Sequence, residues 1–363
     1  MPVRLFRGLI AVSLLAVLAG CHSDVLRPAG DIALQQRDLI YLSTFLMLLI
    51  IVPVMLLTLL FAWRYRQSNK EAAYDPEWSH STKLELVIWS APLAIIIALG
   101  TVTWIATHKL DPYRPLDRID AARALPADVQ YLDVEVVALD WKWLFILPEQ
   151  GVATVNDLVL PVDKPVRFRI TASTVMNTFY VPTLAGMIYA MPGMQTELHA
   201  IVNQPVDTTG VSAHYSGAGF TDMRFRFRGL PQAEFDQWVA QLRADGGELN
   251  REVYLQLEQP TRAEPVRHYA KVDPALFKAV LNMCVDPNKM CMSDMMAIDA
   301  KGGLGKAGIF NVSQLSYDAQ RARGLERPRP NYVLAMCDTD TPSYLARTSL
   351  SSEAAARAAG NTP

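Results

Sequence analysis

The sequence predicts a membrane α-helical hairpin, then an exported all-β sandwich with a C-terminal helical extension. Three observations carry this prediction. Apolar residues concentrate before residue 110, in two runs long enough to cross a bilayer. Residues 131–229 show the alternating, β-branched and aromatic pattern of strands, interrupted by Pro and Gly. Beyond residue 229 the apolar spacing changes to the period of a helix.

Composition narrows the classes of function. The chain has 363 residues, of which 51% are hydrophobic, and a formal net charge of −2. This near-neutral balance gives no electrostatic reason to expect a nucleic acid or an acidic substrate as partner. The length suffices for one or two domains in addition to membrane segments.

Residues 1–20 are typical of a bacterial lipoprotein signal peptide. Arg4 and Arg7 give the positive start, LIAVSLLAVLA is the apolar core, and LAGC places Cys21 directly after a small-residue cleavage site. We expect the Cys21 thiol to be diacylated and Cys21 to begin the mature chain. The alternatives are a plain signal peptide, or an uncleaved helix with a Cys there by chance.

Residues 21–107 are predicted to hold the lipid anchor and two transmembrane helices. Residues 39–63 contain no charge, and residues 84–106 contain only Glu85, near their start. At about 1.5 Å per residue, each run can cross roughly 30 Å of hydrocarbon. Pro53 and Pro92 fall inside these runs, where neighbouring helices can satisfy the freed carbonyl groups.

The lipid anchor predicts the topology. Cys21 must leave the cytoplasm to be processed, and two spans return the chain to the same side of the membrane. The loop of residues 64–83 is then cytoplasmic, and everything after roughly residue 108 is periplasmic. We therefore expect a protein of the bacterial inner membrane with a periplasmic N-terminus and C-terminal domain. Charge counts are a weaker guide here, because long exported domains cross largely regardless of charge.

Residues 125–230 are predicted to form the β domain. YLDVEVVALDWKWLFIL alternates along its length, and LVLPVDKPVRFRITA contains the turn DKP followed by an alternating run. TELHAIV and MRFRFRGL continue the pattern. Several short strands with Pro and Gly between them favour a sandwich or a barrel.

Residues 231–285 are predicted to be a helical extension, and residues 286–363 a partly disordered tail. Apolar residues at helical spacing indicate a first amphipathic helix. Asp273, followed by Pro274, is the expected N-cap of a second helix. The last twenty residues are rich in Ser and Ala and are predicted to be disordered. The stripe of the first helix consists of Phe235, Trp238, Val239 and Leu242.

The periplasm is oxidising, so a disulfide between Cys284 and Cys291 is expected, with Cys337 left over. A soft-metal patch is the competing interpretation, because MCVDPNKMCMSDMM is also rich in Met. No His accompanies these residues, which favours the disulfide.

The order of segments resembles subunit II of the haem–copper terminal oxidases, over roughly residues 20–285. HSTKLELVIWSAPL resembles the second span of that family, and DWKWLF resembles its aromatic strand. NTFYVPTLAGMIYAMPGMQTELH resembles the stretch that leads into the copper domain. The resemblance implies that the β domain is a cupredoxin-like Greek-key sandwich.

In the cytochrome c-oxidising branch this domain holds a dinuclear copper centre, with the run Cys-x-Glu-x-Cys-Gly-x-x-His-x-x-Met and an earlier His. Only the Met is kept here, and Ser or Phe side chains are poor or absent donors for copper. We therefore expect no metal and no other cofactor in this chain. A role for His214 together with His199 is remote, because a stable site needs three or four ligands. Aligned without a gap, the ligand positions are Asn177, Ser212, His214, Ser216, Phe220 and Met223.

This pattern of loss resembles the cytochrome bo-type ubiquinol oxidase branch, which also has a lipidated N-terminus and an aromatic-rich C-terminal extension. The resemblance implies the non-catalytic subunit II of a proton-pumping complex that oxidises ubiquinol and reduces oxygen to water. Haems and copper are then expected in the large subunit I, with other small membrane subunits beside it. This subunit would support assembly of the complex.

The resemblance also gives Glu85 a role. It matches the Glu of the family's Thr-x-Leu-Glu, at the cytoplasmic mouth of a proton path into the large subunit. An ionisable residue in a span is a functional candidate by default. The alternative is a Glu in the first turn of a helix, stabilised by the helix dipole.

Two other functions compete with this one. A copper-carrying subunit II of a cytochrome c oxidase is disfavoured by the missing thiolates. A periplasmic lipoprotein could instead handle copper through its Met- and Cys-rich tail.

Overall fold

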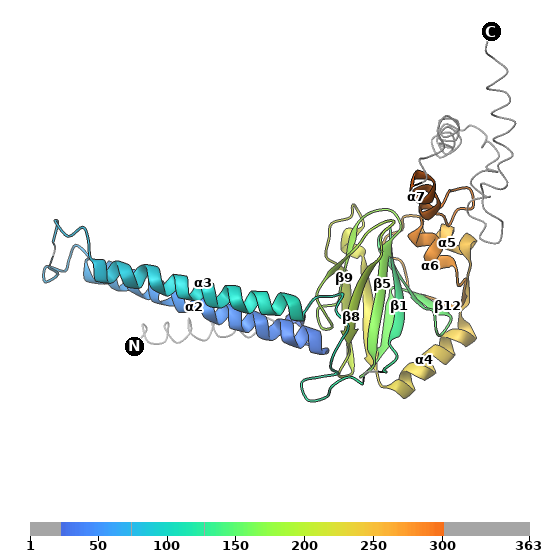
Figure 1. The fold of residues 1–363 in the computed structure, drawn as a ribbon, viewed down its shortest axis with the longest axis horizontal. Helices are drawn as coiled ribbons and strands as arrows, with labels where there is room; N and C mark the ends of the chain where they lie inside the picture. The colour runs from blue at the N-terminus through green and yellow to red at the C-terminus, as the bar shows by residue number, and fades with distance from the viewer. Residues whose placement is uncertain (1–22, 74, 127, 301–363) are drawn as a thin grey trace, which may run out of the picture. The chain divides into compact units, whose positions relative to one another are not determined.

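The computed structural model describes residues 23–73, 75–126 and 128–300. They form two compact units, one with the long helices and the other with the strands (Figure 1). The predicted signal peptide, Cys21, Cys337 and residues 301–363 of the predicted tail lie outside the described residues. The predicted fold class, a helical hairpin followed by a cupredoxin-like β-sandwich, is confirmed.

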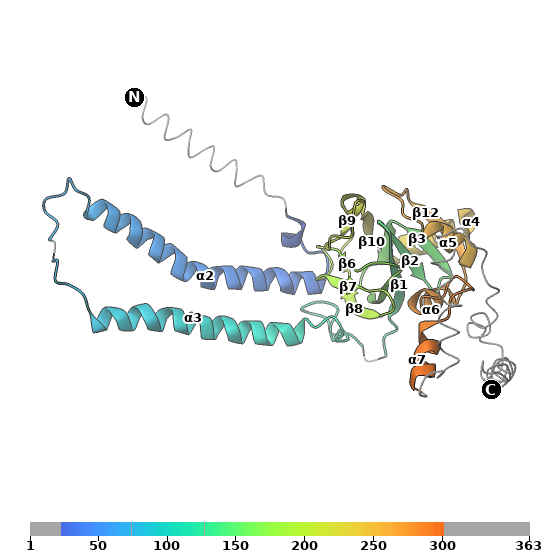
Figure 2. The same ribbon diagram turned by 90° about the horizontal axis from the view of Figure 1, so that it is seen from above.

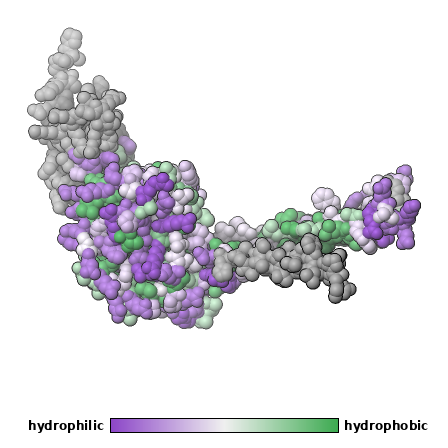
Figure 3. Space-filling view, turned by 180° about the vertical axis from the view of Figure 1, so that it is seen from behind, coloured by the Kyte–Doolittle hydropathy of each residue, from purple (hydrophilic) through white to green (hydrophobic). Residues whose placement is uncertain are grey.

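The helical unit contains the short helix η1 (Asp24–Leu26) and the long helices α2 (Asp31–Arg64) and α3 (Thr82–Lys109). Both long helices are long and apolar enough to cross a membrane. Figure 3 shows apolar surface along them and hydrophilic residues at their tip. The two helices run alongside each other in opposite directions, and Figure 2 shows α2 bent in its central part, where Pro53 removes a backbone hydrogen bond.

Both helices extend beyond the apolar runs that predicted them. α2 begins eight residues before the run at residue 39, because its polar first turns continue the helix outside the apolar segment. The unit also includes Pro182–Gly186. The backbone carbonyl of Thr183 accepts hydrogen bonds from the N–H groups of Ala29 and Gly30, at 2.7 and 3.1 Å. These bonds satisfy N–H groups at the start of α2 that have no partner within the helix.

The second unit is a sandwich of a seven-stranded and a five-stranded sheet. The larger sheet has the order β11-β12-β3-β2-β1-β5-β8, and the smaller has the order β4-β10-β9-β6-β7. The strands of the larger sheet are β1 (Leu132–Leu139), β2 (Lys142–Leu147), β3 (Val152–Val155), β5 (Pro165–Ala172), β8 (Thr196–Ile201), β11 (Gly247–Leu249) and β12 (Arg267–Val272). Those of the smaller sheet are β4 (Asp157–Pro161), β6 (Asn177–Tyr180), β7 (Ile188–Ala190), β9 (Val206–Ser212) and β10 (Arg224–Leu230).

An aromatic cluster fills the space between the sheets. Phe179 of β6 and Phe225 of β10 stack with ring centroids 5.6 Å apart. Trp143 and Phe145 of β2 meet them from the other sheet, with centroids between 5.0 and 6.3 Å away. Phe168 of β5 completes the cluster at 5.4 Å from Phe179. Edge-to-face and stacked pairs of this kind add to the stabilisation from burial alone.

The sequence predicts a helical C-terminal extension, but the extension also contains two strands. It contains α4 (Gln232–Asp245), α5 (Arg251–Leu257) and α6 (Leu276–Leu281), but also β11 and β12. β12 pairs antiparallel with β3, with Arg267 opposite Val155. The pairing covers an edge that would otherwise expose unpaired backbone groups. Asp273 is not the N-cap of α6, because a turn intervenes: its carboxylate accepts from the Ala275 N–H at 2.9 Å.

The extension also covers the outer face of the seven-stranded sheet. Side chains of α5 and α6, such as Tyr254 and Phe277, pack with Val137 and Leu144 in a second core. As a result every residue of β2 is buried, on both faces of the strand. Residues 292–300 of the predicted tail form a further helix, α7 (Met292–Ala300).

Candidate functional site

Three of the six copper-ligand positions meet at one end of the five-stranded sheet. Asn177 begins β6, and Ser212 ends the neighbouring β9. The Ser212 hydroxyl donates a hydrogen bond to Asn177 Oδ1 at 3.2 Å. The Ser212 N–H donates to the backbone carbonyl of Met223 at 3.2 Å. All three residues are buried, so this end of the loop is held by hydrogen bonds and packing.

The other three positions face different partners. The His214 ring meets the ring of Tyr189 edge-on, with centroids 6.2 Å apart. Phe220 packs on Tyr215 at 5.7 Å. Ser216 takes part through its backbone carbonyl, which accepts a hydrogen bond from Nε1 of Trp141 at 3.0 Å. Aromatic contacts and backbone hydrogen bonds therefore occupy these positions.

Trp141 covers this loop, and two glycines make room for it. A Cβ on Gly219 would stand 2.3 Å from Cδ2 of Trp141, so no other residue fits without a shift. Gly217 has a φ of 108° and lies beneath the same indole ring. Trp141 itself has a φ of 64°, which is uncommon for a non-glycine residue. In the sequence Trp141 stands out only as part of DWKWLF, and the glycines of YSGAGF are the signal that could have indicated this close contact.

The donors present do not fit a dinuclear copper centre, because that centre needs two thiolates and two imidazoles and the loop offers two hydroxyls, one amide and one imidazole. Among the described residues, no three His, Cys, Asp or Glu side chains are grouped so that they could hold a metal ion. His199 lies in β8 of the other sheet and meets the Tyr131 ring at 5.6 Å, whereas His214 meets Tyr189. Cys284 and Cys291 are joined in a disulfide.

Glu85 lies in the first turn of α3, and its N–H donates to the Ser81 carbonyl at 2.9 Å. Its carboxylate Oε1 lies 2.7 Å from Nδ1 of His80. Nε2 of His80 lies 3.1 Å from the Thr82 hydroxyl. His80 was not predicted as a functional residue, although it lies in the motif HSTKLE. A carboxylate paired with an imidazole is an arrangement that can bind and transfer a proton.

A buried lysine links the sandwich to its extension. The Lys142 ammonium donates hydrogen bonds to the Gln259 carbonyl at 2.8 Å and to the Thr261 hydroxyl at 2.7 Å. The side chain is fully buried, and this burial lowers its pKa from the ordinary value. Lysine is rarely buried, so its burial could not be expected from its residue type. The signal in the sequence was its position in DWKWLF, between two tryptophans.

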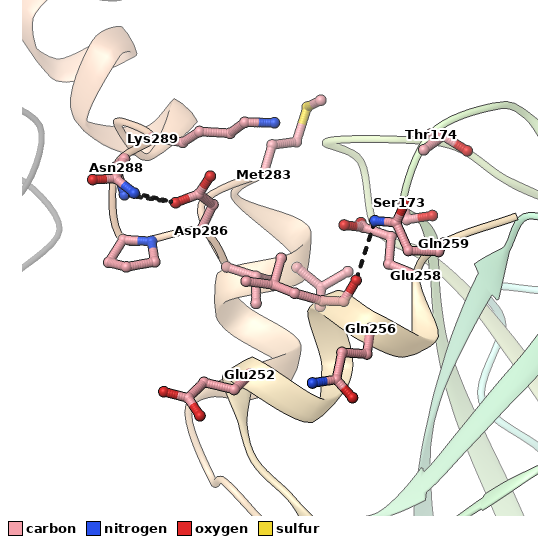
Figure 4. A pocket seen from close by; sticks show the side chains of 14 residues that line it. Ser173, Thr174, Glu252, Gln256, Glu258, Gln259, Met283, Asp286, Asn288 and Lys289 are labelled. Atoms are coloured by element: carbon pink, nitrogen blue, oxygen red, sulfur yellow. Dashed lines mark hydrogen bonds between the residues drawn. The ribbon is translucent and has the colours of Figure 1, made fainter. Parts of the chain in front are cut away.

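Next to this link lies a pocket of about 850 Å³, between α5, α6 and the loop that follows α6 (Figure 4). Its walls carry Glu258, Asp286 and Lys289. Burial raises the pKa of Glu258, although the Lys289 ammonium acts in the opposite direction. Within the pocket, the Asn288 amide donates to the Asp286 carboxylate at 2.8 Å. The pocket was not predicted from the sequence, because its walls come from segments far apart in the chain.

Two segments of the chain match models of known protein families. Residues 136–226 match the family "Cytochrome C oxidase subunit II, periplasmic domain", and residues 243–288 match "COX Aromatic Rich Motif". The second match falls on the extension that packs on the seven-stranded sheet.

The chain is similar to cytochrome bo(3) ubiquinol oxidase subunit 2 of Pseudomonas putida, at 47% identity over 77% of this chain and 86% of the relative. It is similar to ubiquinol oxidase subunit 2 of Acetobacter aceti, also at 47% identity, over 73% of this chain and 84% of the relative. Among solved structures, the periplasmic domain of subunit II of cytochrome oxidase from Bradyrhizobium japonicum is 22% identical, covering 32% of this chain and 94% of that one, with a TM-score of 0.30. With the two relatives at 47% identity over most of its length, this chain belongs to the family of ubiquinol oxidase subunit 2.

Proposed function

We propose that this chain is the non-catalytic subunit II of a proton-pumping ubiquinol oxidase that oxidises ubiquinol and reduces oxygen to water. The large subunit I would carry the haems and copper, and other small membrane subunits would complete the complex. The observation that carries this proposal is the loop between Ser212 and Met223. This loop connects β9 to β10 of the sandwich. The copper-ligand positions in and beside it make hydrogen bonds and aromatic contacts.

The chemistry of the donor supports a loop without copper. A water-soluble donor protein must pass electrons through the periplasmic domain, and a copper relay serves that purpose. Ubiquinol is a lipid that dissolves in the bilayer, so it can give electrons to the membrane part of the complex directly. A relay above the membrane would lie off that route.

The proposed topology places the N-terminus and the sandwich in the periplasm and the loop between α2 and α3 in the cytoplasm. Two apolar helices and a family named for a periplasmic domain fit an inner-membrane protein. Within this topology, Glu85 lies at the cytoplasmic end of α3 and takes up protons for the large subunit. Cys21 carries a lipid anchor. The remaining role of the chain is to support assembly.

Purification of the tagged full chain from detergent-solubilised membranes tests the proposal. We expect a haem-bearing partner to copurify and the complex to consume oxygen with ubiquinol but not with reduced cytochrome c. Preference for cytochrome c, with copper bound at the loop, would favour the electron-transfer subunit instead. A chain that binds copper only through residues 284–363 and brings no haem protein would favour the copper-handling lipoprotein.

A further inference from the structure

Methionine side chains from two segments, Met283 and Met292, lie beside Gly193 in the sandwich unit. A Cβ on Gly193 would stand 3.0 Å from Sδ of Met292 and 3.5 Å from Sδ of Met283. Both sulfurs therefore lie on the same side of a turn in which the Met194 N–H donates to the Met191 carbonyl at 3.3 Å. Gly193 has a φ of 69°, so glycine suits the turn and also leaves the space that the two thioethers occupy.

The disulfide holds Met283 and Met292 in this position. Met283 precedes Cys284, Met292 follows Cys291, and the two cysteines are bonded. Beside the disulfide, the Met292 N–H donates to the Asn282 carbonyl at 2.9 Å. Met283 has a φ of 57°, a conformation that costs free energy for a non-glycine residue and persists where the surroundings impose it.

Most of these methionines are accessible to solutes, and Met292 is partly buried. Met283 is 46% exposed, Met194 is 55% exposed and Met296 is 63% exposed, whereas Met290 of the same loop is 5% exposed. Met292, Met295 and Met296 follow helical spacing on α7 and so share a face. Figure 4 shows the Met283 side chain at the rim of the pocket. Methionines that only fill a core would be buried like Met290.

The donor set selects one kind of ion. Thioether sulfur is a soft, uncharged ligand that suits copper(I), whereas zinc, calcium and magnesium require imidazole, thiolate or oxygen donors. The two nearby thiols are oxidised to a disulfide. No group of three His, Cys, Asp or Glu side chains lies within the described part of the chain to serve those other ions.

We propose that Met283 and Met292, together with Met194 and the exposed methionines of α7, form a thioether site for copper(I). The site uses none of the six positions of the copper-ligand pattern, and binding involves no redox step. It is a property of this subunit additional to its place in the oxidase, and it does not depend on the proposed function.

The test is an anaerobic titration of the full chain in detergent with copper(I), in competition with a copper(I) chelator. A Cys337→Ser background removes a thiol that would compete for the ion. We expect one copper(I) per chain and an X-ray absorption spectrum with sulfur as the only scatterer in the first shell. Affinity should be unchanged between about pH 5.5 and 7.5, because thioethers release no proton on binding, unlike imidazole or thiol ligands.

Substitutions locate the site. Met283→Leu/Met292→Leu nearly conserves volume, and we expect it to weaken copper(I) binding at least about tenfold. Cys284→Ser/Cys291→Ser should also weaken binding, because the loop no longer holds the two sulfurs together. Met290→Leu, in the same loop but buried, and Met223→Leu, in the former ligand run, should bind copper(I) as the parent does.

Four results would overturn the proposal. They are a parent chain that binds no copper(I), a double-leucine variant with parental affinity, nitrogen or oxygen in the first shell, and loss of binding in Met223→Leu.

Discussion

Nδ1 of His80 lies 2.7 Å from Oε1 of Glu85, which joins an imidazole and a carboxylate at the first turn of α3. Both side chains are about half exposed or more in this chain. A carboxylate that only stabilised the start of a helix would need no such partner. The pair can bind a proton from water and pass it on, which fits the proposed uptake of protons at this end of the hairpin.

Glu85→Ala should slow quinol oxidase turnover several-fold while haem content and assembly stay intact. The physical reason is the loss of the carboxylate in the first turn of α3, which is proposed to carry a proton inward. Stopped-flow spectroscopy should show that the slowed step is reduction of the oxygen-binding site. Glu85→Asp, which keeps the carboxylate, should recover part of the rate. Full turnover in a correctly assembled Glu85→Ala complex would leave only the helix-dipole role.

Restoring the ligands should restore a copper centre. The hydrogen bond between Ser212 and Asn177 shows that these positions lie within reach of each other. A variant with all five replacements should bind two coppers at this loop and show the visible absorption and electron-spin signature of a mixed-valence pair. The unmodified chain should show neither signal. Coloured, stoichiometric copper at this loop in the parent would contradict the prediction. The replacements are Asn177→His, Ser212→Cys, His214→Glu, Ser216→Cys and Phe220→His.

Mass spectrometry of the mature N-terminus should find Cys21 as the first residue with acyl groups attached. Cys21→Ser should remain in the membrane fraction, because two apolar helices hold the protein far more strongly than one lipid does. Any defect of that variant should therefore appear in assembly of the complex. A mature chain that begins at Met1, or an unmodified Cys21, is the contrary result.

Glu258→Gln should stabilise the protein at neutral pH. Burial raises the pKa of Glu258 above its ordinary value of 4.5, so the stability that the protonated form contributes is present below that value and is lost as the pH rises through the raised pKa. Thermal unfolding between about pH 4 and 8 should show the variant gaining over the parent as the pH rises. Glu252→Gln, at an exposed residue on the same pocket wall, is the matched control for loss of a carboxylate charge.

Gly219→Ala should lower the melting temperature. The added Cβ would stand 2.3 Å from the Trp141 ring, and overpacking of this kind costs about 1–3 kcal/mol. Gly247→Ala is a matched control, because its Cβ would meet Tyr269 at an ordinary 3.9 Å. Equal melting temperatures for the two variants would show that the Trp141 contact is not tight.

Sequence reasoning succeeded where the signal was local. The stripe from Phe235 to Leu242 is buried along α4 as its spacing predicted, and the two apolar runs lie within α2 and α3. Strands β11 and β12 escaped prediction because they are short and their stability comes from pairing. β12 finds its partner β3 more than 100 residues earlier in the chain, and no local pattern encodes such a pairing.

The same limit applies to the candidate site. The six ligand positions could be aligned from the order of residues alone, but their contacts could not be predicted. Nothing in GVSAHYSGAGFTDM states that Trp141, some 70 residues earlier, donates to the Ser216 carbonyl. His80 was within the quoted motif, yet only the folded turn brings its ring to Glu85.

The pairing of β12 with β3 also means that the sandwich is completed only after the C-terminal extension has been synthesised. Synthesis runs from the N-terminus, so the seven-stranded sheet remains open at β3, with its outer apolar face uncovered, until β12 and the helices around it have been made. A chain that stops or is cut between residues 231 and 285 leaves this apolar face exposed to solvent. Chaperones and proteases act on exposed apolar surface of this kind, so we expect incomplete copies to be degraded before they reach a partner.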